Sequence, residues 1–158
     1  MNIDKNRGFT IVEVLISMLI LSIGVMGLGI LQLTSVQNTQ SGKMRSQASI
    51  LAFGIIDSMR ANIPAVTGGS YRVALNAVTP AAQSCQGIAA DCTTIQMANS
   101  DINQWRTALA NSLPSGTGQV VTADLGDTTQ VTVTIAWLDP ITAANGSEQL
   151  SFTSELPK

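Results

Sequence analysis

The chain has 158 residues, of which only 11% are charged and 4% are aromatic, and its formal net charge is −2. Its mean hydropathy is nevertheless positive, at +0.28, because apolar residues are concentrated near the amino terminus. This length gives room for one domain and a membrane segment, but not for two full domains. The eight lysines and arginines are scattered along the chain, which argues against a nucleic-acid partner, because such binding needs a basic patch.

The chain contains no histidine. Histidine is the commonest metal ligand and the commonest general base near neutral pH, so its absence disfavours metal sites and acid–base catalysis. The sequence also shows no recognisable pairing of a nucleophile with a base. We therefore expect a protein without enzymatic activity, cofactor or metal.

Residues 9–31 form an apolar segment that carries a single charge, Glu13. As a helix, this segment would span about 35 Å, which is enough to cross the hydrocarbon core of a bilayer. Lys5 and Arg7 precede it, so the positive-inside tendency places the amino terminus in the cytoplasm and the rest of the chain on the exported side. A cleaved secretory signal is the alternative, but its apolar region would be shorter, about 7 to 15 residues, and would end in a small-residue cleavage site.

Glu13 is an unusual residue inside such a segment. A carboxylate at the centre of a bilayer costs about 2.5 to 3.5 kcal/mol, and less near the interface. Either Glu13 lies close enough to the headgroups to stay hydrated, or it pairs with a cation on another chain.

The sequence RGFTIVEVL at residues 7–15 closely resembles the class III signal of type IV pilins and pseudopilins. In that signal a basic leader ends in Gly, Phe follows, and Glu is the fifth residue of the mature chain. The resemblance implies that prepilin peptidase cuts between Gly8 and Phe9 and that the new amino group of Phe9 is methylated. It also implies an assembly role for Glu13, which would pair with the Phe9 ammonium of a neighbouring subunit or with its own.

Helical periodicity continues beyond the apolar segment. Apolar residues recur at steps of three or four, which places them on one face of a helix: Met44, Ala48, Leu51, Ile55 and Met59. Pro64, followed by Gly68 and Gly69, signals the end of the helix. We predict one helix over about residues 9–62, whose second half packs on a globular head, while Ile50 and Phe53 on the opposite side either meet another subunit or are simply exposed.

The two cysteines, Cys85 and Cys92, lie seven positions apart on the predicted exported side. They are expected to form a disulfide. A metal site is the alternative, but it would need ligands beyond two thiols.

The rest of the chain predicts an extended segment, a second helix and a sheet. Residues 71–78 are expected to be extended, residues 94–113 to form a helix with Trp105 in the core, and residues 116–118 to form a turn. Residues 131–137 alternate between apolar and smaller or polar side chains, as in a strand, and its expected partners are residues 119–124 and 149–156. The fold class is α+β, with the long helix packed on an antiparallel sheet of three to four strands, which is the type IV pilin fold.

Residues 22–62 point to a more specific group within this family. They look like the long helix of PilV-type minor pilins of type IVa pili, and the sequence MRAN at residues 59–62 is the most specific part of this resemblance. It implies a leader (1–8), a transmembrane and assembly helix (9–32) and a periplasmic head (33–158). It further implies that the chain joins other minor pilins in the bacterial inner membrane, helps to initiate polymerisation of the major pilin, and stays at the pilus tip, where an adhesin can attach. Adhesion and twitching motility would follow indirectly.

Two other functions remain open from the sequence. A minor pseudopilin of a type II secretion system would share the whole signal. The head could also be an adhesin or receptor-binding module on a pilin stem.

Overall fold

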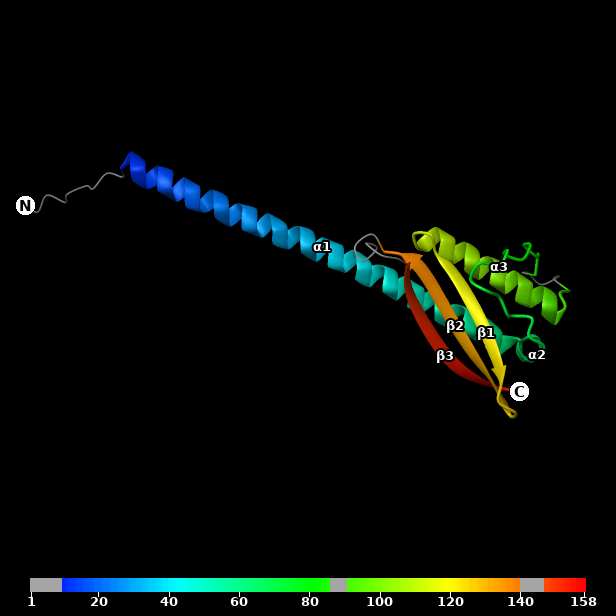
Figure 1. Ribbon diagram of the computed structural model, residues 1–158. Coiled ribbons are helices and arrows are strands. Elements are labelled where there is room, and N and C mark those ends of the chain that lie inside the picture. The colour runs from blue at the N-terminus through cyan, green and yellow to red at the C-terminus, as the bar shows by residue number, and fades with distance from the viewer. Residues whose placement is uncertain (1–9, 86–90, 140–146) are drawn as a thin grey trace, which may run out of the picture. The chain divides into compact units, whose positions relative to one another are not determined.

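The computed structural model describes residues 10–85, 91–139 and 147–158. Its elements are α1 (Ile11–Ala61), α2 (Ile63–Thr67), α3 (Thr94–Ser112), β1 (Thr117–Asp124), β2 (Thr128–Leu138) and β3 (Ser147–Pro157) (Figure 1). The chain divides into two compact units, one that ends at Gln40 and one that runs from Ser41 to Lys158. We call the second unit the head and describe each unit by itself.

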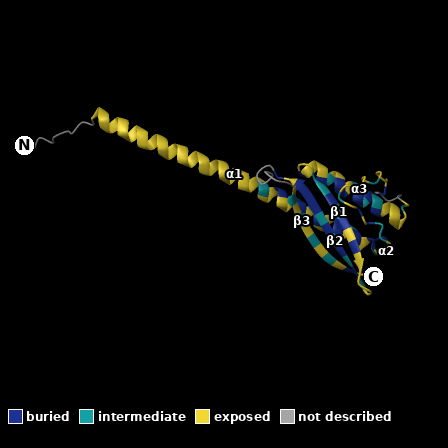
Figure 2. Cartoon of the chain, in the orientation of Figure 1, coloured by how far each residue is buried: buried dark blue, intermediate teal, exposed yellow. Residues whose placement is uncertain are grey.

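In the first unit, α1 runs as a continuous helix through Gly24, Gly27 and Gly29. Every described residue up to Gln40 is exposed (Figure 2). Among the described residues, α1 is the one helix whose length and apolar composition would suit a membrane crossing. This unit therefore offers an apolar surface that its own chain does not cover.

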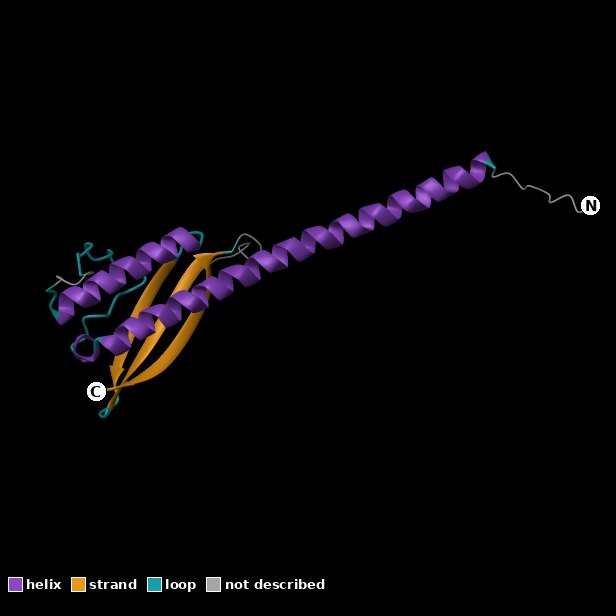
Figure 3. Cartoon of the chain, turned by 180° about the vertical axis from the view of Figure 1, so that it is seen from behind, coloured by secondary structure: helices purple, strands orange, loops and turns teal. Residues whose placement is uncertain are grey.

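In the head, the second part of α1 and α3 lie on the same face of the sheet, as seen from both sides (Figures 1 and 3). The predicted stripe on α1 is confirmed: Met44, Ala48, Ile55 and Met59 are buried and Leu51 is partly buried. The stripe, Trp105 and other apolar residues of α3, and the inward-facing residues of β2 belong to one hydrophobic core. The core placement predicted for Trp105 is thus confirmed.

The sheet has the order β1-β2-β3, and both pairs are antiparallel. Burial alternates along β2 from Thr128 to Ile135, as its two-residue period predicts. The α+β fold with a long helix on a small antiparallel sheet is therefore confirmed, with three strands in the described residues.

The turn predicted at residues 116–118 is wrong in part, because Thr117 and Gly118 already belong to β1. A Cβ on Gly118 would lie 2.3 Å from Cη2 of Trp105. Gly118 is therefore needed for the close approach of the indole ring and not for a turn.

The extended segment predicted at residues 71–78 is also largely wrong. Val73 forms an isolated bridge with Val120, and turns follow it. The carbonyl groups of Ala74, Leu75 and Ala77 accept hydrogen bonds from the side chain of Arg106 on α3. Because these carbonyls are committed to a side chain, the segment does not continue as a strand along β1.

The long helix ends at Ala61, one residue before the predicted boundary. Pro64 does not stop all helical structure, since it lies in the first turn of the short helix α2. Proline is tolerated there because the backbone N–H groups of a first turn have no partner within the helix.

Candidate functional site

The predicted processing residues Gly8 and Phe9, together with the leader 1–8, lie outside the described residues. Thr10 directly precedes α1. The carbonyl of Thr10 accepts hydrogen bonds from the backbone N–H of Glu13 at 3.1 Å and of Val14 at 3.3 Å, and its hydroxyl also accepts from Glu13 N–H at 3.3 Å. The helix therefore begins next to the predicted cleavage position.

Glu13 lies in the first turn of α1, where the helix dipole favours a negative charge. Its apolar neighbours on the helix, such as Val12 and Leu15, are more than 60% exposed. In the part of the chain that the structure describes, the Glu13 carboxylate forms no ion pair. If another molecule covers this surface, the carboxylate will need a cation as its partner.

Cys85 and Cys92 form the expected disulfide. Their sulfurs are therefore not available to a metal, and no cluster of three or more potential metal ligands occurs among the described residues. The disulfide closes the segment that leads into α3.

The sequence did not reveal a row of polar side chains on α3 that holds the segment before the disulfide. Ser100 donates to the carbonyl of Gln83 at 3.2 Å, and the Asn103 amide donates to the carbonyl of Pro80 at 2.7 Å. Arg106 continues the row one turn later. The spacing of three residues places all three on one side of α3, a pattern that resembles an ordinary solvent-facing helix surface.

Arg106 is 6% exposed. Its guanidinium donates to the carbonyls of Ala77 at 2.5 Å, Leu75 at 2.6 Å and Ala74 at 3.0 Å. Burial lowers the pKa of this guanidinium from its usual value. The planar fork suits several acceptors at once, so Arg106 fixes the segment after Val73 against the head.

A second buried polar cluster joins the end of α1 to α3. The Tyr71 hydroxyl donates to Oδ2 of Asp101 at 2.5 Å, and the Asn62 amide donates to the Thr94 carbonyl at 2.8 Å and to the Tyr71 oxygen at 3.4 Å. Burial, followed by the bond to Asp101, raises the pKa of Tyr71. This cluster therefore fixes the fold and leaves Tyr71 protonated as a donor.

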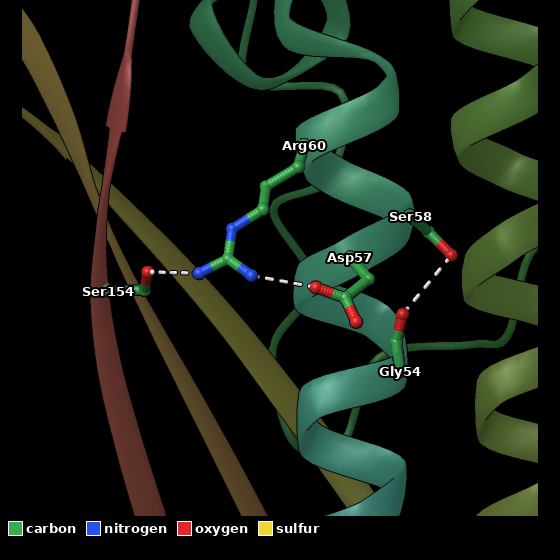
Figure 4. Close-up of polar contacts among 5 residues, drawn as sticks. All are labelled: Gly54, Asp57, Ser58, Arg60 and Ser154. Carbon is green, nitrogen blue, oxygen red and sulfur yellow. Dashed lines mark hydrogen bonds and ion pairs between the residues drawn. The ribbon is translucent and has the colours of Figure 1, made fainter.

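Three contacts join α1 to β3, and we call this line of contacts the α1–β3 seam. Arg45 pairs with Glu148 at 3.1 Å, the rings of Phe53 and Phe152 lie 5.2 Å apart, and Arg60 donates to Ser154 Oγ at 3.3 Å. Figure 4 shows Arg60 directed from α1 toward β3, with Asp57 on its other side at 2.7 Å. Phe53 thus has a partner in its own chain but stays 55% exposed, whereas Ile50 is 61% exposed.

Two family models match the chain. The Tt1218-like model, described as type IV pilin Tt1218, matches residues 30–103, and the prokaryotic N-terminal methylation motif matches residues 3–29. The second match contains Gly8, Phe9 and Glu13. No curated protein and no solved structure matches the chain.

Proposed function

We infer that this chain, which belongs to the type IV pilins, is a minor pilin of the PilV type that helps to initiate pilus assembly. The pilin part of the proposal is carried by the methylation motif, which ends in the exposed apolar part of α1, and the minor-pilin part by the resemblance of residues 22–62 to PilV-type minor pilins. A structural role suits this family, and we propose no catalytic site and no cofactor.

The processing step assigns roles to Gly8 and Phe9. Prepilin peptidase would hydrolyse the bond between them and release residues 1–8, and the amino group of Phe9 would then be methylated. The mature chain would start four residues before Glu13, which is about one helical turn. That spacing supports an ion pair between Glu13 and the Phe9 ammonium of the same chain or of a neighbour.

The proposed location is the bacterial inner membrane, with residues 9–32 as the anchor and residues 33–158, which include the head, in the periplasm. The basic residues Lys5 and Arg7 before the anchor support this orientation, and so does the Cys85–Cys92 disulfide, because disulfides persist in oxidising compartments.

The proposed partners are prepilin peptidase, other minor pilins and the major pilin, with a tip adhesin attached after assembly. A place at the pilus tip would connect the chain to adhesion and twitching motility. The resemblance of residues 22–62 to PilV-type minor pilins supports this proposal over a major pilin.

The first test is intact mass and amino-terminal sequencing of the protein from membranes of its native host. We expect a chain that starts at N-methylated Phe9. A variant with Gly8→Trp should remain uncut, whereas Asn6→Ala serves as the matched control and should be processed. A chain that starts at Met1 in the wild type would refute the proposal.

A second test separates the pilus from a secretion system. Deletion of the gene should reduce the number of surface pili and leave secreted proteins unchanged. The opposite result would identify a pseudopilin.

A further inference from the structure

A groove runs along the head between α1 and α3. Its volume is about 460 Å³, and most of its lining is apolar. The lining includes Ile50, Gly54 and Ser58 of α1 and Asp101, Trp105 and Ala108 of α3. Figure 4 shows Gly54 and Ser58 on the side of α1 that faces away from β3 and toward α3. The groove is therefore separate from the α1–β3 seam.

Helix α3 runs back along α1. The amide of Asn62, directly after α1, donates to the carbonyl of Thr94, the first residue of α3. Asp101 therefore lies at the end of the groove that is near the end of α1, and Ala108 lies toward the opposite end. These two residues are seven positions apart on α3, which corresponds to about 10 Å or two helical turns.

The groove is open to solvent along its length. Ile50 on its rim is 61% exposed, and a Cβ placed on Gly54 would meet no atom within 4 Å apart from the local backbone of α1. Small-molecule sites usually enclose most of the ligand surface, whereas this groove would leave one side of a small ligand in water. A groove between two helices is instead filled well by a ridge of side chains from a third helix.

Asp101 brings an uncompensated charge into the groove. The residue is partly buried, and the Tyr71 hydroxyl donates to its Oδ2 at 2.5 Å. This donor is neutral, and none of the ion pairs among the described residues involves Asp101. A carboxylate that is buried further needs a cation as its partner. An occupant of the groove should therefore supply a positive charge near Asp101.

We propose that the groove between α1 and α3 binds a helix of a partner protein, which places a lysine or arginine against Asp101 and apolar side chains along Ile50 and Ala108. Residues seven positions apart share one face of a helix and lie about 10 Å apart, which matches the distance along α3 from Asp101 to Ala108. The partner helix therefore carries an apolar and a basic residue at this spacing. Apolar contact supplies affinity, and the ion pair fixes the register of the helix in the groove.

The probe is a labelled synthetic helix with leucine at positions i and i+4 and lysine at position i+7, and with alanine and glutamine elsewhere. A sister peptide carries glutamine in place of the lysine. Each peptide is titrated onto the full-length protein in detergent micelles, and binding is followed by fluorescence anisotropy, with empty micelles as the blank. We expect saturable binding of the lysine peptide and at least about tenfold weaker binding of the glutamine peptide.

Asp101→Asn tests the ion pair. The asparagine side chain keeps an oxygen that can accept the hydrogen bond from Tyr71, so the head should remain folded, which tryptophan fluorescence during urea unfolding checks. D101N should bind the lysine peptide about tenfold more weakly than the wild type does, and it should bind the two peptides equally. Asp127→Asn is the matched control, because it removes an exposed carboxylate in the β1–β2 turn, and it should bind as the wild type does.

Gly54→Leu tests the groove itself. The leucine side chain has free space in its own chain and would occupy the position of the partner's apolar side chains. Gly42→Leu is the matched control, because Gly42 also lies on α1 with no neighbour within 4 Å of a Cβ but outside the lining of the groove. We expect at least about tenfold weaker binding of the lysine peptide to G54L and wild-type binding to G42L.

The proposal is overturned if the lysine peptide fails to bind the wild type, or if it binds D101N or G54L as tightly as the wild type. Displacement of the peptide by an equal concentration of hexylammonium would also overturn it and would identify a site for a small amine. Self-association of the wild type that both variants abolish would assign the groove to a second copy and overturn it as well. None of these results affects the proposed function, which is tested separately by the amino-terminal start of the mature chain.

Discussion

Glu13 and Arg106 are two charged residues in opposite surroundings. Glu13 lies on the first part of α1, where its apolar neighbours are exposed and where it forms no ion pair within the described chain. Arg106 is buried in the head, and three backbone carbonyls of its own chain accept its hydrogen bonds within 3.0 Å.

This difference distinguishes the interactions that the chain makes within itself from those that another molecule would have to supply. The head satisfies its buried cation internally and assembles a continuous core. The first part of α1 has neither a core nor a counter-ion in the described residues. Stability should therefore depend on the head, and incorporation into a filament should depend on the helix.

The largest effect is expected from Glu13→Gln. If the carboxylate pairs with the Phe9 ammonium inside an assembly, the variant leaves a buried charge without its partner, which costs about 3 to 5 kcal/mol. The amount of the chain recovered in sheared pili should fall more than about tenfold, as measured by immunoblot against the membrane fraction. The unfolding of the head should not change.

Asp127→Asn is the matched control, because it removes an exposed carboxylate from the β1–β2 turn. It should enter pili normally. Wild-type recovery of the E13Q chain in pili would contradict the division of roles between helix and head.

Arg106→Met should produce the converse result, with a destabilised head. The substitution keeps an apolar stem but leaves buried carbonyls without donors, which should lower the free energy of unfolding by about 3 kcal/mol. Both tryptophans, Trp105 and Trp137, are buried in the head, so their fluorescence during urea unfolding of the full chain in micelles reports on the head.

Arg60→Met provides the control for Arg106, because Arg60 is half-exposed and its loss should cost less than about 1 kcal/mol. Arg106→Lys should be intermediate, since an ammonium keeps the charge but lacks the planar fork. Equal midpoints for R106M and R60M would show that the hydrogen bonds of Arg106 add no stability.

The contrast between Glu13 and Arg106 also explains which features could be predicted from the sequence. Periodicity predicted the buried face of α1, the helix around Trp105 and the alternation of β2, because each depends on residues close together in the chain. Glu13 was singled out because a lone charge in an apolar segment is conspicuous.

Arg106 was missed because a polar residue on an amphipathic helix normally faces solvent. Its burial results from the segment at residues 74–77, which packs over it and is 29 or more positions away. Gly118 was misread for the same reason, since the ring of Trp105 that occupies its space comes from another element. Such contacts between distant segments leave no periodic pattern in the sequence.

Reduction of the Cys85–Cys92 disulfide should affect the head less than loss of Arg106. A closed loop of about eight residues contributes about 2.5 kcal/mol in the chain-entropy model. The same fluorescence assay, run with and without a reductant, should show this shift in the wild type and none in a Cys85→Ser, Cys92→Ser variant. Identical midpoints for the oxidised and reduced wild type would rule out a stabilising role for the disulfide.

The smallest effect is expected at the surface of the head, where Lys158 Nζ contacts Asp124 Oδ1 at 2.5 Å. The hydrogen bond from Lys158, followed by that from the Gly126 N–H, holds the pKa of Asp124 below its usual value. A depressed pKa in the folded state stabilises the fold at pH values above the unfolded pKa of about 3.9, and this contribution is lost as the pH falls through the lower folded value.

Lys158→Ala should raise the pKa of Asp124 toward its usual value. The pKa should not return fully to that value, because the Gly126 N–H still donates. The carboxyl NMR shift of Asp124, followed against pH, measures the change. The stability difference between K158A and the wild type should therefore be present at neutral pH and vanish in acid, whereas a difference that persists below the folded pKa would mean that Lys158 acts through packing and not through charge.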